Sequence, residues 1–163
     1  MGIVYVSIGE TEIKRILSKF LGPSKRIPLS CIGLTMTDFL VTEIDINWLI
    51  SEDDVKDHRG ILQGVMIQEA ASQGMICYVA SMNLFPNHLP AFLGSEHFKL
   101  RATVYSGDNL HIKITDIRWR GKVGCASANA FIENSQKRAA TIRKMFFTAY
   151  SDNNVIQTAE MAT

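Results

Sequence analysis

The chain has 163 residues, of which 47% are hydrophobic and 20% are charged, and its net charge is +1. This length and composition are typical of a soluble globular domain that is large enough to bury a hydrophobic core. The chain carries no concentrated basic block, which disfavours nucleic acid as its main partner, because phosphate binding needs a positive face.

The first half of the chain predicts two helices with extended chain between them. A short amphipathic helix is predicted at about residues 11–21. Residues 29–48 are rich in β-branched and aromatic side chains, which predicts one strand or a hairpin. An acidic loop, SEDDVKD, then leads to a long and mostly apolar helix at about residues 61–82.

The second half of the chain changes its hydrophobic period to two, which is the period of a strand. Four strand-like runs are predicted, at about residues 91–105, 110–120, 123–133 and 138–150. The breaks SGDN, RGK and NSQK between them are rich in turn-forming residues. The polar tail, at about residues 151–163, is predicted to fray.

This order of elements favours one architecture. A helix that is apolar nearly all round must be covered on several sides. We therefore expect an α+β fold in which a curved antiparallel sheet, arranged as a meander, wraps around the central helix. Residues 1–163 are predicted to form one domain.

The sequence also predicts the compartment. Three widely spaced cysteines without a CxxC motif indicate free thiols in a reducing compartment. The start, MGIVYVSIGE, lacks the basic and apolar regions of a secretory signal, and polar residues interrupt the most apolar segment, which disfavours a membrane span. We expect a cytoplasmic protein. The four histidines show no metal-ligand spacing, so no metal site is expected.

The central helix carries the most specific motif of the chain. Its segment GVMIQEAASQ resembles the hot-dog fold β-hydroxyacyl-(acyl carrier protein) dehydratases, which carry a Pro-Gly, an apolar run and Glu-Ala-x-Ala-Gln. Gly64, Glu69 and Gln73 fall on positions of that motif. Downstream, LRATVYSGDNLHIKI resembles a strand and Gly-Asp turn of the family, and RWRGKVGCASANAFIE resembles the strand pair that follows. The similarity extends over residues 13–149.

The histidine that precedes the helix in this family has one candidate here, His58. The family continues with Phe-Pro, whereas His58 is followed by Arg59 and Gly60, and its loop to Gly64 is three residues shorter. Counted without a gap, the histidine position falls on Val55 instead.

The resemblance implies dehydration of a (3R)-hydroxyacyl thioester to its trans-2-enoyl product, in fatty-acid or polyketide-type biosynthesis. His58 would remove the C2 proton as the base, and Glu69 would protonate the leaving hydroxyl. The backbone N–H of Gly64, at the start of the helix, would stabilise the enolate-like oxygen. Val65 would bind substrate beside it, and Gln73, one turn after Glu69, would orient the carboxyl group.

The resemblance also implies partners. In the family the base and the acid come from different subunits, which implies a homodimer with two shared sites and leaves open a further assembly of dimers. The substrate would be carried on the phosphopantetheine arm of acyl carrier protein, and no cofactor is expected.

Two other functions stay open on the residues alone. A hot-dog thioesterase would use Glu69 as base or nucleophile and would not need His58. A non-catalytic acyl-binding or scaffolding subunit would keep the fold without the base. The residues also allow plainer interpretations: a polar helix stripe for Glu69, a surface position for His58, and a close-packing role for Gly64.

Overall fold

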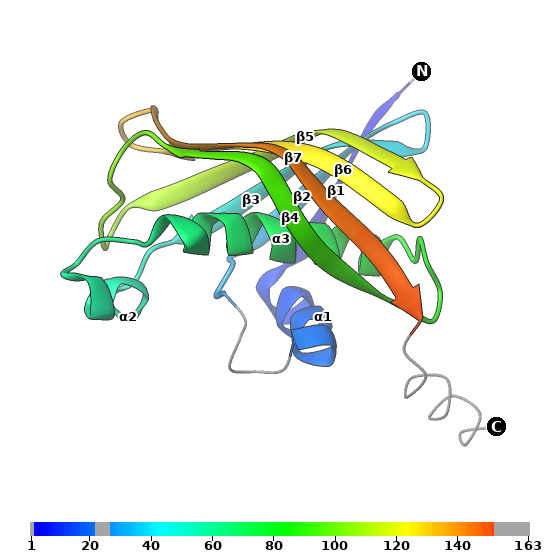
Figure 1. The fold of residues 1–163 in the computed structure, drawn as a ribbon, viewed down its shortest axis with the longest axis horizontal. Coiled ribbons are helices and arrows are strands. Elements are labelled where there is room, and N and C mark those ends of the chain that lie inside the picture. The colour runs from blue at the N-terminus through cyan, green and yellow to red at the C-terminus, as the bar shows by residue number, and fades with distance from the viewer. Residues whose placement is uncertain (1, 22–26, 152–163) are drawn as a thin grey trace.

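The computed structural model describes residues 2–21 and 27–151. Across these ranges, seven strands form one antiparallel sheet in the order β1-β2-β3-β5-β6-β7-β4. The sheet curves over one side of helix α3 (Gly64–Ser81), and helix α1 (Glu10–Leu21) lies on the other side of α3 (Figure 1). The strands are β1 (Ile3–Gly9), β2 (Cys31–Thr37), β3 (Leu40–Leu49), β4 (His88–Leu100), β5 (Asn109–Arg120), β6 (Val123–Ile132) and β7 (Lys137–Ser151).

Helix α3 begins three residues after the predicted start of residues 61–82, because the chain before it is extended. Ile61 forms an isolated bridge with Tyr105, and the Leu62 N–H donates to the Val104 carbonyl at 2.9 Å. Gln63 keeps an extended backbone and caps the helix. The helix is buried almost continuously from Ala70 to Val79, as expected for a helix covered on several sides.

The predicted α+β architecture, an antiparallel sheet around a central helix, is confirmed, and the sheet is not closed. The segment at residues 29–48 is the hairpin of β2 and β3. The predicted helix at residues 11–21 is α1, which includes one more residue at its start. Ser151 ends β7, and the rest of the predicted tail lies outside the described residues.

The predicted meander is wrong for one strand. Strands β5, β6 and β7 are consecutive neighbours, but β4 pairs with β7 at the edge of the sheet and not with β5. The chain after β4 does not form a tight turn. It bonds instead to the segment before α3 and to the end of β3, where the Gly107 N–H donates to the Ile50 carbonyl at 2.8 Å. These bonds carry the chain to the middle of the sheet, beside β3.

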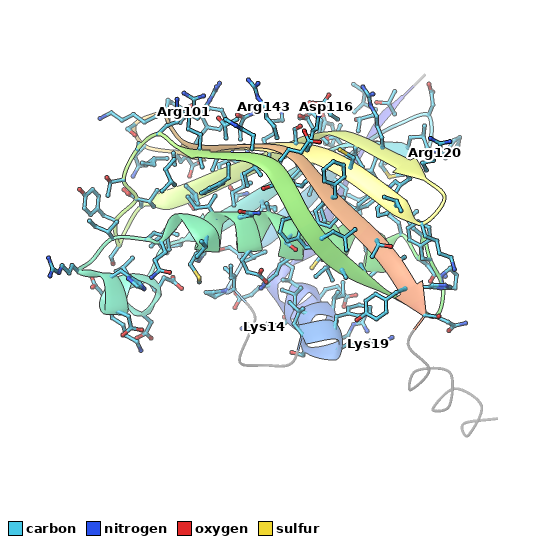
Figure 2. All side chains as sticks on the ribbon, in the orientation of Figure 1. Lys14, Lys19, Arg101, Asp116, Arg120 and Arg143 are labelled. Carbon is cyan, nitrogen blue, oxygen red and sulfur yellow. The ribbon has the colours of Figure 1, made fainter. Side chains whose placement is uncertain are left out.

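The face of the sheet that is turned away from α3 is polar. Arg101, Asp116 and Arg143 project from it (Figure 2). These three residues also line a hollow of about 720 Å³ on that face, together with Ser127, Asn129 and Thr141 among others. The hollow therefore lies across the sheet from the helix that carries Glu69, and it is separate from the residues of α3.

Candidate functional site

The segment that leads into α3 is held by a short helix and a turn. Helix α2 (Glu52–Val55) follows Ser51, whose backbone N–H and hydroxyl both donate to the Asp54 carboxylate at 2.8 Å. A 3-10 turn, η2 (Lys56–His58), continues from it. Val55 is fully buried and anchors the segment in the core. An apolar buried side chain cannot act as a base, so the ungapped alternative at Val55 offers no base.

His58 ends the 3-10 turn and is exposed to solvent in the single chain. Arg59 and Gly60 follow with positive φ angles of 57° and 79°, and they reverse the chain toward α3. This reversal places the His58 Nδ1 atom 2.6 Å from the Gln63 amide nitrogen, Nε2. The structure therefore brings His58 to the residue that caps the helix.

Glu69 and Gln73 face each other on α3. The Gln73 amide nitrogen donates to Glu69 Oε1 at 2.9 Å, and its amide oxygen accepts the Ile27 backbone N–H at 2.7 Å. A backbone N–H can only donate, so the amide oxygen must face Ile27 and the amide nitrogen must face Glu69. Gln73 is fully buried and Glu69 is partly buried. The carboxylate is thus held by a side chain whose own orientation is fixed.

Gly64 opens α3, where the first N–H groups of a helix lack intrahelical partners. A Cβ atom at this position would lie 2.7 Å from Cδ1 of Leu100, so the glycine also lets Leu100 pack over the helix start. Val65, the next residue, is exposed. Gly64 therefore has a close-packing role, and the binding roles expected for Gly64 and Val65 stay predictions.

The predicted residues form two groups in one protomer. His58 lies at the helix cap, and Glu69 lies about 7.5 Å further along the axis than Gly64, at 1.5 Å per residue. His58 and Glu69 share no hydrogen bond or ion pair within the described part of one chain.

An apolar surface surrounds the helix start. Four large apolar side chains there are exposed: Ile61, Val65, Leu100 and Tyr105. Ile61 and Leu100 also line a hollow of about 230 Å³, together with Leu62, Ile67 and the segment 101–104. Exposed apolar area beside a polar site is a common feature of subunit and ligand contacts.

Sequence reasoning missed three contributors to this site. Gln63 could have been found, because it stands between the histidine and the helix motif. Ile27 could not, since its backbone N–H meets Gln73 across 46 positions of the chain. Leu100 meets Gly64 only through the fold of β4.

No group of three or more metal-binding side chains that could hold an ion occurs in residues 2–21 and 27–151. None of the helices in these same residues is long and apolar enough to span a bilayer.

Comparisons with known proteins define the class. No protein-family model matches the sequence. The solved dehydratase heterocomplex ApeI:P from Xenorhabdus doucetiae is similar with a TM-score of 0.58 and 15% identity, over 76% of this chain and 83% of that chain. A hypothetical thioesterase with coenzyme A from Streptococcus pneumoniae is similar with a TM-score of 0.52 and 12% identity, over 68% of this chain and 82% of that chain. The sheet, the central helix and these likenesses make the chain a hot-dog fold protein.

Among hot-dog fold proteins, the chain is similar in sequence to dehydratases. The 3-hydroxyacyl-[acyl-carrier-protein] dehydratase FabZ of Clostridium tetani is 32% identical over 89 residues, which are 55% of this chain and 61% of that protein. The chain thus matches about three fifths of the length of this relative. This relative and two further FabZ dehydratases, from Desulforamulus reducens (28% identical over 86 residues) and Geobacter metallireducens (30% identical over 88 residues), confirm the resemblance to the hot-dog dehydratases that the helix motif indicated.

Proposed function

We propose that the chain is a hot-dog dehydratase that converts a (3R)-hydroxyacyl thioester on acyl carrier protein to the trans-2-enoyl thioester. The observation that carries this proposal is the Glu69 carboxylate, held by Gln73 on a partly buried face of α3. The similarity to the FabZ dehydratases supports it. A fatty-acid or polyketide-type pathway in the cytoplasm is the proposed setting.

The proposed reaction has two proton transfers. His58 removes the C2 proton of the substrate, and the electron pair of that C–H bond forms the C2–C3 double bond. The hydroxyl leaves C3 with its bonding electrons and takes a proton from Glu69, so it departs as water. A proton returned from His58 to Glu69 by way of solvent restores the starting state.

Negative charge develops on the thioester oxygen as the C2 proton leaves. The N-terminus of α3 would stabilise this charge, because its unpaired N–H groups and helix dipole are both positive there. Gly64 and Val65 would supply those N–H groups. No cofactor is proposed, since the chemistry needs only an acid, a base and an oxyanion site.

Gln63 would determine which ring nitrogen of His58, the proposed base, carries the proton. With its amide nitrogen against His58 Nδ1, the neutral ring carries its proton on Nε2 and has no free basic nitrogen. Rotation of the amide by half a turn would put its oxygen against an Nδ1–H group and leave Nε2 basic. We propose that the second arrangement is the one that acts on substrate.

The proposed active form is a homodimer. The His58 of one protomer and the Glu69 of the other would share one substrate. The exposed side chains of Ile61, Val65, Leu100 and Tyr105 would be covered in such a dimer.

The test is the mass of the product. Purified protein is incubated with 3-hydroxyacyl and saturated acyl carrier protein substrates, and the carrier is followed by mass spectrometry. Loss of water from the hydroxyacyl substrate supports the dehydratase. Release of free acid from either substrate contradicts it and supports the thioesterase, which the likeness to the Streptococcus pneumoniae structure keeps as the second candidate.

Two variants assign the roles. Glu69→Gln and His58→Ala are each expected to lower the dehydration rate by a factor on the order of 100 or more, because each removes a proton-transfer group. Glu52→Gln and His97→Ala are matched controls, since both side chains are exposed and lie outside the proposed site. A wild-type rate for either site variant would remove that residue from the mechanism. Binding of acyl carrier protein without turnover by the wild-type protein would favour the non-catalytic subunit.

A further inference from the structure

The hollow on the face of the sheet turned away from α3, here called the outer hollow, is lined by polar side chains from β4, β5, β6 and β7. Arg101, Asp116 and Arg143 project on this face (Figure 2). Of the described residues that line the outer hollow, Ile142 alone is apolar, and Ile142 is buried. Its volume of about 720 Å³ falls within the range of small-molecule sites, about 300–1,000 Å³.

A chain of hydrogen bonds holds one wall of the outer hollow in place. The Arg101 Nε–H donates to the Thr141 hydroxyl at 3.1 Å, and that hydroxyl donates to Asn129 Oδ1 at 3.3 Å. Thr141 is buried, so its hydroxyl fixes the Arg101 side chain from below. The terminal nitrogens of Arg101 and the amide nitrogen of Asn129 have no hydrogen-bond partner among the described residues, and they stay available as donors.

Positive charge exceeds negative charge in the outer hollow. Its charged lining consists of four cationic side chains and two carboxylates, namely Arg101, Arg138, Arg143, Lys144, Glu96 and Asp116. Lys144 and Glu96 neutralise each other, because the Lys144 Nζ atom lies 2.5 Å from Glu96 Oε2. The three arginines form no ion pair within residues 2–21 and 27–151. Guanidinium groups in this state suit phosphate, since each presents its donors in a planar fork.

Two of the arginines stand apart along the outer hollow. The Arg101 N–H donates to the Ala139 carbonyl at 2.8 Å, and Arg143 follows Ala139 by four residues on β7. At about 3.3 Å per residue, the two backbone positions are separated by roughly 13 Å. An elongated anion with several charged groups can contact both side chains, and it fits this arrangement better than a single small ion.

We propose that the outer hollow binds a small molecule that carries two or more phosphate groups. Arg101 and Arg143 bind phosphate oxygens by charge-assisted hydrogen bonds, and the Asn129 amide adds a neutral donor. An acidic protein segment fits less well, because the centre of a protein contact is apolar and the outer hollow offers only the buried Ile142.

The first test is titration calorimetry of the full chain with inorganic triphosphate, without divalent metal. We expect binding that weakens as the ionic strength rises. Arg143→Gln should raise the Kd by a factor on the order of 10, because charge-assisted hydrogen bonds are lost. Arg120→Gln is the matched control, since Arg120 is an exposed arginine of β5 that does not line the outer hollow. No binding by the wild type, or equal increases of Kd in both variants, would overturn the proposal.

Asp116 provides a change of opposite sign. Its carboxylate lines the outer hollow and repels a bound phosphate. Asp116→Asn should therefore lower the Kd for triphosphate, by a factor of about 5 for a repulsion across about 4 Å of water. A higher Kd in Asp116→Asn would contradict binding in the outer hollow.

Thr141 tests whether the site is built or is only a region of positive charge. Thr141→Val changes no charge but removes the hydroxyl that holds Arg101, so it should raise the Kd. Thr141→Ser keeps the hydroxyl and should retain the wild-type Kd. Circular dichroism must give the wild-type spectrum for both variants. A wild-type Kd in a folded Thr141→Val would refute the proposed positioning of Arg101.

A short oligoglutamate peptide separates the two kinds of partner. Triphosphate should bind more tightly than this peptide, and tighter binding of the peptide would overturn the small-molecule site in favour of an acidic protein segment.

The site uses neither His58 nor Glu69, so it does not rest on the proposed dehydration. Arg143→Gln should keep the wild-type dehydration rate, because Arg143 lies on the face turned away from α3. Arg101 is unsuitable for this comparison, since it also lines the smaller hollow at the start of α3. A wild-type protein that binds triphosphate but lacks dehydratase activity would contradict the proposed function and support the outer hollow as a binding site.

Discussion

At the scale of single residues, Gln73 links the backbone to the candidate acid. Its amide oxygen satisfies the Ile27 N–H, and its amide nitrogen holds Glu69. The side chain is fully buried, so water cannot replace either bond without entering the core. Gln73 therefore holds the Glu69 carboxylate in place, and it also ties the segment before β2 to α3.

Gln73→Leu should lower both stability and rate. The Ile27 N–H would be left buried without its acceptor, which costs about 1–3 kcal/mol of unfolding free energy. The Glu69 carboxylate would lose its fixed donor. Urea unfolding measures the first effect, and the kcat of dehydration measures the second. Gln68→Leu is the control, because Gln68 donates to the Ser95 hydroxyl, at 3.1 Å, and not to a buried backbone group or to Glu69 among the described residues. Equal effects of the two variants would refute the special role of Gln73.

At the scale of elements, glycine decides how closely α3 approaches its neighbours. A Cβ at Gly74 would clash with the side chain of Ile46, including Cγ1 at 2.9 Å, and Ile46 is fully buried in β3. The three atoms nearest to a Cβ at Gly64 all belong to the side chain of Leu100, which is half exposed. The first neighbour has no room to move, whereas the second can turn toward solvent.

Gly74→Ala is therefore expected to destabilise the fold, and Gly64→Ala to be tolerated. Overpacking a core costs about 1–3 kcal/mol, and without room for Ile46 to move this cost outweighs the gain of about 1 kcal/mol in helix propensity from glycine to alanine. Thermal unfolding should show a lower Tm for Gly74→Ala, and the added change Ile46→Val should restore part of it. A higher Tm for Gly74→Ala would contradict this expectation and show that β3 can shift to accommodate the added methyl group.

The elements also show what the sequence could predict. α1 and α3 were predictable, because an apolar stripe and a long apolar run each favour a helix. The strands after residue 90 were predictable from their period of two, with boundaries shifted by a few residues. The position of β4 beside β7 could not be predicted, because it depends on long-range bonds such as that between the Gly107 N–H and the Ile50 carbonyl. No local sequence pattern indicates these bonds. β1 was missed, since its short run lies at the start of the chain with no turn signal before it.

The same limit applies to the site. Glu69 and Gln73 were predictable from a helical motif that sets both on one face. Val55 is buried and offers no base at the ungapped position, but only the fold could show this burial. The contact of His58 with Gln63 depends on two left-handed residues, Arg59 and Gly60, whose conformation reverses the chain.

At the scale of the whole molecule, the core that surrounds α3 contains an acid that the proposed mechanism does not use. Cys77 is fully buried, and this burial, with a smaller effect of the Glu12 charge, raises the pKa of its thiol from 9.0 to about 12. Burial also raises the pKa of Tyr78. The interior thus favours the neutral form of both groups, and alkaline conditions act against the fold.

The stability of the protein should fall as the pH rises from 9 toward 12. In this window the thiol of the unfolded chain ionises while the folded thiol stays neutral. The unfolded state then binds fewer protons, so the unfolding free energy decreases with pH, by about 1.4 kcal/mol per unit for one such group. Urea unfolding under reducing conditions, at about pH 8 and about pH 10.5, measures the slope.

Cys77→Ala isolates the contribution of the thiol. This variant is less stable at every pH because of the cavity. Between about pH 8 and about pH 10.5, however, its unfolding free energy should fall by about 2 kcal/mol less than that of the wild type. The effect of Tyr78 is common to both proteins and cancels in the comparison. Cys125→Ala controls for the loss of one cysteine, because its thiol is only partly buried. Parallel slopes for wild type and Cys77→Ala would mean that the thiol can ionise inside the folded protein, and hence that water reaches this side of α3.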